Sequence, residues 1–106
     1  MDYKAATGKR IDEYTGEIIG VSKRIHAEPE LGHKEFKASK LIVKELEKHG
    51  FEVVLGVAGM DTAFIARKGT GSPKIGILAE YDCLPGIGHA CGHNLIAASA
   101  LGAAIG

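Results

Sequence analysis

The sequence has no tryptophan, few aromatic residues, and no excess of charge of either sign. Thirteen basic and thirteen acidic residues cancel, so no basic surface points to nucleic acid or an anionic membrane as a partner. The longest apolar run, LIAASALGAAI at residues 95–105, is too short to span a bilayer. The first residues, MDYKAATGKR, lack the apolar core of a signal peptide, and we therefore expect a cytoplasmic protein.

Cysteine is also scarce, because Cys83 and Cys91 are the only two. In a reducing compartment a metal-binding or catalytic thiol is a better expectation than a structural disulfide. A thiol redox protein that uses both cysteines stays an alternative, but the sequence has no CxxC motif to favour it.

Hydrophobic periodicity predicts two amphipathic helices in the first half of the chain. The first covers roughly residues 9–26, and Pro29 and Gly32 follow its end. The apolar residues at helical spacing in this segment are Ile11, Tyr14, Ile18, Val21 and Ile25. The second helix runs from about 34 to 49, with Gly50 placed as a left-handed residue after its end. Its expected inward residues are Phe36, Leu41, Ile42 and Leu46.

The pattern then changes to that of strands. FEVVLGV at 51–57 and DTAFIARK at 61–68 each predict a strand, and GTGSP predicts a turn after the second. KIGILAEYD at 74–82 is nearly continuous in apolar residues, which is typical of a strand buried on both faces. A loop rich in glycine follows at 83–93, and a last helix is expected to open near Asn94 as its N-cap.

The predicted order α, α, β, β, β, loop, α belongs to a layered α/β or α+β architecture in one organised region, residues 1–106. The last helix is apolar on nearly all sides, and the third strand requires neighbours that the two other strands and two helices do not supply. We therefore expect the chain to be part of a larger fold. A small homo-oligomer that covers these surfaces with its own copies is the alternative.

The loop LPGIGHACGHN places His89, Cys91 and His93 at alternate positions. Thiolate and imidazole are ligands that suit zinc and neighbouring transition metals. Alternation along an extended backbone would set the three side chains on one side, and the following helix N-terminus would favour an ionised Cys91. On spacing alone, a free cysteine with two solvated loop histidines stays open, and so does a cysteine nucleophile with a histidine base.

Two carboxylates precede this loop at the expected carboxyl end of the third strand, where open α/β sheets bind ligands. Glu80 and Asp82 flank Tyr81 and are predicted to point to the same side. Asp82 is then a candidate for orienting a histidine ligand or a metal-bound water. The alternative is a polar strand end that meets solvent.

The segments HAEPELGHKEFKAS, GFEV, TAFIARKG and above all AEYDCLPGIGHACGHN together resemble the M20 family of metallopeptidases and amidohydrolases. The resemblance runs from about residue 10 to the end. It is strongest to the branch of aminobenzoyl-glutamate hydrolase-like, N-acyl-amino-acid and dipeptide hydrolases. It implies a partial three-layer α/β/α catalytic domain, in an enzyme that holds two divalent metals, zinc or manganese, and works as a homodimer.

Carried over by position, the resemblance implies that Cys91 and His93 are metal ligands. It also implies that Asp82 is the aspartate that does not bind the metal itself but orients its surroundings. His89 fits the motif but is not expected to be a ligand, the role of Glu80 stays open, and Cys83 receives no role. The remaining histidines are expected to be structural: His26 and His33 on helix surfaces, and His49 as a favourable charge at a helix C-terminus.

The resemblance also indicates what these 106 residues lack. Relatives supply a Glu-Glu pair, which includes the general base, and further histidines in a longer chain, together with a lid or dimerisation domain. The expected reaction is hydrolysis of the amide of a small N-acyl amino acid, an aminobenzoyl-glutamate type compound or a dipeptide, and the isolated chain is expected to be inactive. The rival hypothesis is a non-enzymatic relative that acts as a protein-association module.

Overall fold

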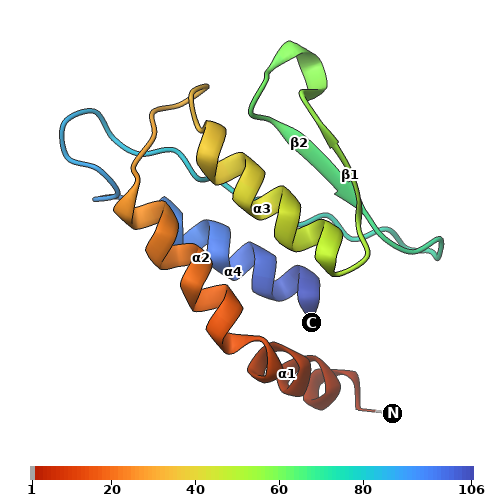
Figure 1. Ribbon diagram of the computed structural model, residues 1–106. Coiled ribbons are helices and arrows are strands. Elements are labelled where there is room, and N and C mark those ends of the chain that lie inside the picture. The colour runs from red at the N-terminus through yellow and green to blue at the C-terminus, as the bar shows by residue number, and fades with distance from the viewer. Residues whose placement is uncertain (1) are drawn as a thin grey trace.

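The computed structural model describes residues 2–106, which form four α-helices and a two-stranded antiparallel sheet (Figure 1). In chain order the elements are α1 (Tyr3–Glu13), α2 (Thr15–Ala27), α3 (Phe36–Lys48), β1 (Glu52–Leu55), the short 3-10 helix η1 (Val57–Gly59), β2 (Phe64–Arg67) and α4 (His93–Ile105). The mixture of helices and strands agrees with the predicted α/β class. The described residues do not form a three-layer sheet fold.

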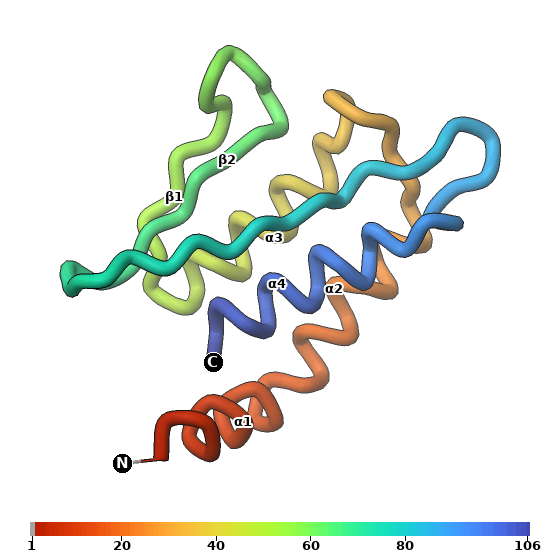
Figure 2. Tube along the Cα trace, turned by 180° about the vertical axis from the view of Figure 1, so that it is seen from behind, coloured from red at the N-terminus to blue at the C-terminus, as the bar shows by residue number. Residues whose placement is uncertain are grey.

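The core lies where α2, α3 and α4 meet, and α2 and α4 run side by side (Figures 1 and 2). Small residues on α4 allow this close packing. Ala97 is fully buried, and a Cβ at Gly102 would lie 3.3 Å from the Cδ1 atom of Ile18 on α2. The buried core residues are Val21, Ile25, Ala38, Ile42, Leu46, Tyr81, Ala97, Leu101 and Ile105. None of the helices within residues 2–106 has both the length and the hydrophobicity to cross a membrane.

The second predicted helix is confirmed as α3, and Gly50 has the expected left-handed conformation, with φ +87°. Ile42 and Leu46 are buried as predicted, but Phe36 is 48% exposed because it is the first residue of the helix. The carboxylate of Glu30 caps this end, since it accepts hydrogen bonds from the backbone amides of Lys37 and Ala38 at 2.8–3.1 Å. These amides have no partner within the helix, so a residue outside the helix anchors its first turn.

The two strands predicted at 51–57 and 61–68 are confirmed as a short hairpin, β1 and β2. The strands pair from Glu52 with Arg67 to Leu55 with Phe64, and the hairpin packs against α3. They are shorter than predicted because the backbone leaves the ladder at Gly56, which has φ +86° and opens η1.

The prediction of one helix over 9–26 was wrong, because the chain breaks at Tyr14 into α1 and α2. Tyr14 has φ −110° and ψ 16°, and its amide bonds to the carbonyl of Ile11. The Thr15 hydroxyl donates to the carbonyl of Asp12 at 3.0 Å, an interaction by which threonine competes with continued helix. The break sets the ring of Tyr14 edge-on against His49, with 4.5 Å between the ring centroids.

The prediction of a buried third strand at 74–82 was also wrong for the described structure. The segment runs extended across the side of α3 opposite to the view of Figure 1, and no strand within residues 2–106 pairs with it (Figure 2). Ile75 and Leu78 are each 85% exposed, so these two apolar side chains are not covered, whereas Tyr81 near the end of the segment is buried in the core. A strand requires a hydrogen-bonded neighbour, and among residues 2–106 the ladder contact nearest to this segment is a single parallel bridge between Leu31 and Cys83, one residue beyond its end.

The last helix begins at His93 rather than at Asn94, and its N-cap is Gly92, with φ +83°. Asn94 is therefore not the cap that the sequence predicted. It lies in the first turn, faces α2, and its buried Nδ2 donates to the hydroxyl of Ser22 at 3.1 Å. This polar contact fixes the rotation of α4 on α2 and so the direction of His93.

Candidate functional site

The candidate site centres on a hydrogen-bonded pair, Asp82 and His93. The Nδ1 atom of His93 lies 2.7 Å from Oδ1 of Asp82 and 3.1 Å from the carbonyl oxygen of the same residue. Both partners are acceptors, so Nδ1 must carry the proton. In a neutral ring the lone pair then lies on Nε2, which is the arrangement that metal-binding histidines have when a carboxylate holds the other nitrogen.

The turn that follows α2 holds Asp82 in place. The carbonyl of Glu30 accepts a hydrogen bond from the amide of Cys83 at 2.8 Å, beside the bridge between Leu31 and Cys83. Gly32 packs close to Asp82, because a Cβ at Gly32 would lie 3.9 Å from the Oδ2 atom of Asp82. The HAEPELG segment therefore positions the aspartate, although it is far from it in sequence.

The loop between Asp82 and His93 is a series of turns. Leu84 and Gly88 form an antiparallel bridge, in which the amide of Leu84 donates to the carbonyl of Gly88 at 2.9 Å. The expectation that residues 89, 91 and 93 share one side of an extended backbone was wrong. The backbone turns there, so that His89 is buried, while Cys91 is exposed. Both cysteines are free thiols, and Cys83 is buried.

His89 is the most unusual polar group of the loop. It is only 8% exposed, and within residues 2–106 neither of its ring nitrogens has a hydrogen-bond partner. Burial lowers the pKa of His89, and the neighbouring His26 and His93 lower it further, against weaker opposing effects of Asp82 and the Ile25 carbonyl. The ring is therefore neutral, and it packs near His26 with 6.4 Å between the centroids.

His26 and His33 have different surroundings. His26 is exposed in the last turn of α2, as predicted for a helix surface. The prediction for His33 was wrong, because it lies in the turn before α3 with φ +67°.

A hollow of about 280 Å³ lies beside Asp82, and Glu80, Tyr81, His33 and Glu35 are among the residues that line it. Glu80 and Asp82 thus border the same space, as their spacing predicted. The Tyr81 hydroxyl donates to the carbonyl of Thr62, whose own hydroxyl donates to Glu35 at 3.0 Å. Burial, and then the negative charge of Glu35, raise the pKa of Tyr81 to about 12, so that its hydroxyl is un-ionised at neutral pH.

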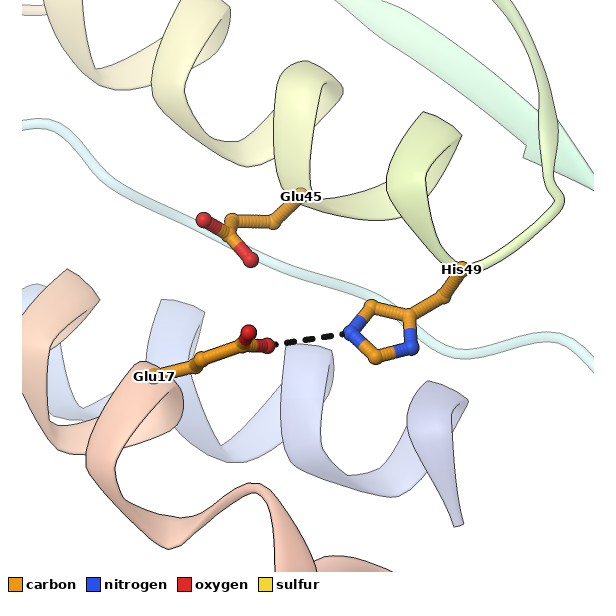
Figure 3. Close-up of side chains that lie close together, drawn as sticks. All are labelled: Glu17, Glu45 and His49. Carbon is orange, nitrogen blue, oxygen red and sulfur yellow. Dashed lines mark hydrogen bonds and ion pairs between the residues drawn. The ribbon is translucent and has the colours of Figure 1, made fainter.

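Among the described residues, only one group brings three possible metal-ligand atoms within 4.8 Å of one another, and it consists of Glu17, Glu45 and His49 (Figure 3). Asp82, Cys91 and His93 do not form such a group. The sequence did not predict the group of Glu17, Glu45 and His49, and it predicted only a favourable charge at a helix C-terminus for His49. In the structure His49 is buried at the end of α3 and its Nε2 lies 3.1 Å from Oε2 of Glu17. The signal available in the sequence is the four-residue spacing of Glu45 and His49 on one helix face.

The chain matches no family model. It is 35% identical to a p-aminobenzoyl-glutamate hydrolase of Escherichia coli over 80% of its own length and 21% of that protein. It is 35% identical to the human Xaa-Arg dipeptidase over 97% of its length and 27% of that protein. It is 32% identical to the hippurate hydrolase of Campylobacter jejuni over 74% of its length and 24% of that protein.

These relatives are hydrolases or peptidases by name, and the chain spans between a fifth and a third of their length. The similarity covers the Asp82–His93 pair as well as the helices that support it, since the human relative matches 97% of the chain. The chain belongs to the M20 family of amidohydrolases and peptidases.

Proposed function

We propose that the protein which carries this chain is a metal-dependent hydrolase of the amide bond in small N-acyl amino acids, aminobenzoyl-glutamate type compounds or dipeptides. The names of its relatives support this class of substrates. The structural observation that carries the proposal is the 2.7 Å contact between Asp82 and His93. A carboxylate that holds Nδ1 of an imidazole leaves Nε2 free for a cation.

The residues present fit part of a site for zinc or manganese. His93 presents a free Nε2, and Cys91 presents an exposed thiol two residues before it. These two side chains would hold the metal from this chain, and the remaining ligands would come from other polypeptide. When bound, a pair of divalent ions would act as a Lewis acid toward the amide carbonyl and acidify the attacking water.

The residues of this chain have positioning roles in the proposal. Asp82 keeps the proton on Nδ1 of His93 and fixes the direction of the ring, because the turn at Glu30 fixes the backbone at Cys83. The base that accepts the proton of water is expected outside this chain. The 106 residues alone should therefore not hydrolyse substrate. The homodimer and the cytoplasmic location expected from the sequence stay part of the proposal.

The test uses the complete gene product that carries this sequence, purified and supplied with zinc or manganese. We expect hydrolysis of hippurate, p-aminobenzoyl-glutamate or an Xaa-Arg dipeptide, lost in Cys91→Ser and in His93→Ala. Glu80→Gln serves as the control, because Glu80 is exposed beside Asp82 and, among the described residues, it is Asp82 that bonds to His93. Full activity of the metal-free protein, or of the Cys91→Ser variant, would refute the proposal.

An association module is the second candidate, and the exposed apolar side chains favour it. Ile75, Leu78 and Leu95 are 85%, 85% and 61% exposed. Large apolar side chains this exposed are typical of a contact with another polypeptide. A complete gene product that binds no metal and hydrolyses none of the three substrates, but associates with a partner through these side chains, would support the module over the enzyme.

A further inference from the structure

We propose that Glu17, Glu45 and His49 form a second cation site, for zinc or a chemically similar divalent transition metal, at the contact of α2 and α3. Each residue offers one ligand atom, and these atoms all lie within 4.8 Å of one another. In Figure 3 the carboxylate of Glu45, on α3, and the ring of His49, which directly follows α3, are directed toward Glu17 on α2.

One distance within the group is close to the separation of two ligands on a small metal ion. The contact between Oε2 of Glu17 and Nε2 of His49 is 3.1 Å. Two ligands of a tetrahedral zinc ion are separated by about 3.3 Å, as follows from bonds of about 2.0 Å. Imidazole with two carboxylates is a ligand set that zinc accepts, and a water would complete the fourth position.

Burial gives an independent reason for a ligand here. The His49 side chain is 5% exposed and lies edge-on against Tyr14, so the orientation of its ring is fixed. The Oε2 atom of Glu45 is buried, and among the residues that the structure describes it has no hydrogen-bond partner. The Nζ atom of Lys48 lies 3.7 Å from this oxygen, beyond hydrogen-bond distance, and a coordinated cation would supply the direct contact that the oxygen lacks.

Lys48 is the cation that competes for this position. Its Nζ lies 2.8 Å from Oε1 of Glu17 and 3.7 Å from Oε2 of Glu45. The hydrogen bond from Lys48, and then the one from His49, lower the pKa of Glu17, so this carboxylate is ionised at neutral pH. The Lys48 side chain is 54% exposed, and it can leave the group for solvent when a divalent cation binds.

The site is separate from the Asp82–His93 pair. Glu17 lies in the first turn of α2 and His49 at the carboxyl end of α3, whereas Asp82 is held by the turn that follows the last residue of α2. A metal at this position would link α2 to α3 and would raise the free energy of unfolding of the chain.

The experiment is a zinc titration, by calorimetry, of the 106-residue chain with Cys91→Ser and His93→Ala, which remove the other candidate ligands. We expect one zinc per chain and a thermal unfolding midpoint that rises with zinc concentration. Adding Glu45→Gln should weaken zinc binding at least 10-fold, because even the loss of a residue that only orients a metal ligand lowers the affinity by about 10-fold. Adding Lys48→Met should strengthen binding several-fold, because the competing ammonium is gone.

Glu47→Gln is the matched control. It makes the same change of charge on the same helix, at an exposed position outside the group. Circular dichroism checks the fold of each variant. Absence of zinc binding in the folded parent chain overturns the proposal, as does equal weakening by Glu45→Gln and Glu47→Gln. If Glu45→Gln does not fold, the Lys48→Met variant decides, and an unchanged affinity there overturns the proposal.

Discussion

The imidazole of His93 donates from Nδ1 to the carboxylate of Asp82, and this bond joins the first turn of α4 to the extended segment that runs behind α3. The two residues are eleven positions apart in the sequence, and the glycine-rich loop between them brings their side chains together. The bond fixes both the position of the proton and the orientation of the ring. Its removal should therefore lower the affinity of the site for metal.

Asp82→Asn should lower the affinity of the complete gene product for zinc by about 10- to 100-fold, the usual effect of losing a group that orients a histidine ligand. The amide can still occupy the space, so the fold is retained. Competition with a zinc-binding dye measures the affinity. Glu80→Gln is the control, and equal affinities of the Asp82→Asn and Glu80→Gln proteins would argue against the assigned role.

Glu30→Gln should lower the free energy of unfolding of the chain by about 1–2 kcal/mol, because a charged acceptor for the amides of Lys37 and Ala38 is lost. Urea denaturation measures the change. Glu28→Gln removes the same charge from an exposed pair with Lys37 at 3.6 Å and should cost well under about 1 kcal/mol. A larger effect of Glu28→Gln than of Glu30→Gln would contradict the capping role.

Tyr81 should give the chain a stability that declines at high pH. Its folded pKa of about 12 lies above the ordinary tyrosine value of 10.0. The contribution is therefore complete below about pH 10 and is lost as the pH rises from about 10 to about 12, where only the unfolded phenol has ionised. Ultraviolet titration should show one of the three tyrosines ionising near pH 12, and Tyr81→Phe should remove that step. Its persistence in Tyr81→Phe would show that another group is responsible.

His89→Leu should leave the free energy of unfolding unchanged or raise it by up to about 1 kcal/mol. The substitution removes two buried nitrogens that have no partner in the described part of the chain, and an unsatisfied buried polar group is costly. Metal affinity should stay the same, because His89 is not expected to be a ligand. Urea denaturation and zinc competition measure the two quantities. A loss of affinity comparable to that of His93→Ala would make His89 a ligand.

The elements that the sequence predicted well are those that local pattern determines. The periodicity of Val21 and Ile25, and of Ile42 and Leu46, marks faces that are buried in the structure, and Gly50 ends α3 as expected. The break at Tyr14 was missed because the apolar spacing continues through it, while a side-chain bond of Thr15 ends α1.

Non-local contacts explain the remaining differences. The apolar run at 74–82 indicated a strand, but pairing depends on neighbours that periodicity does not specify. The place of Asp82 at the expected strand end, together with the resemblance to the M20 family, predicted that it orients a histidine ligand. The structure brings Asp82 and His93 together, and their part in metal binding stays a prediction. Glu17 could not be connected with His49 from the sequence, since they lie on different helices 32 residues apart.

The extended segment with exposed Ile75 and Leu78 has a consequence for the behaviour of the chain in solution. Its free backbone edge and uncovered side chains offer a template on which other molecules of the same chain can add strands. Self-association that increases with concentration is therefore expected of the purified 106 residues, and Ile75→Lys should suppress it without disturbing the helical core.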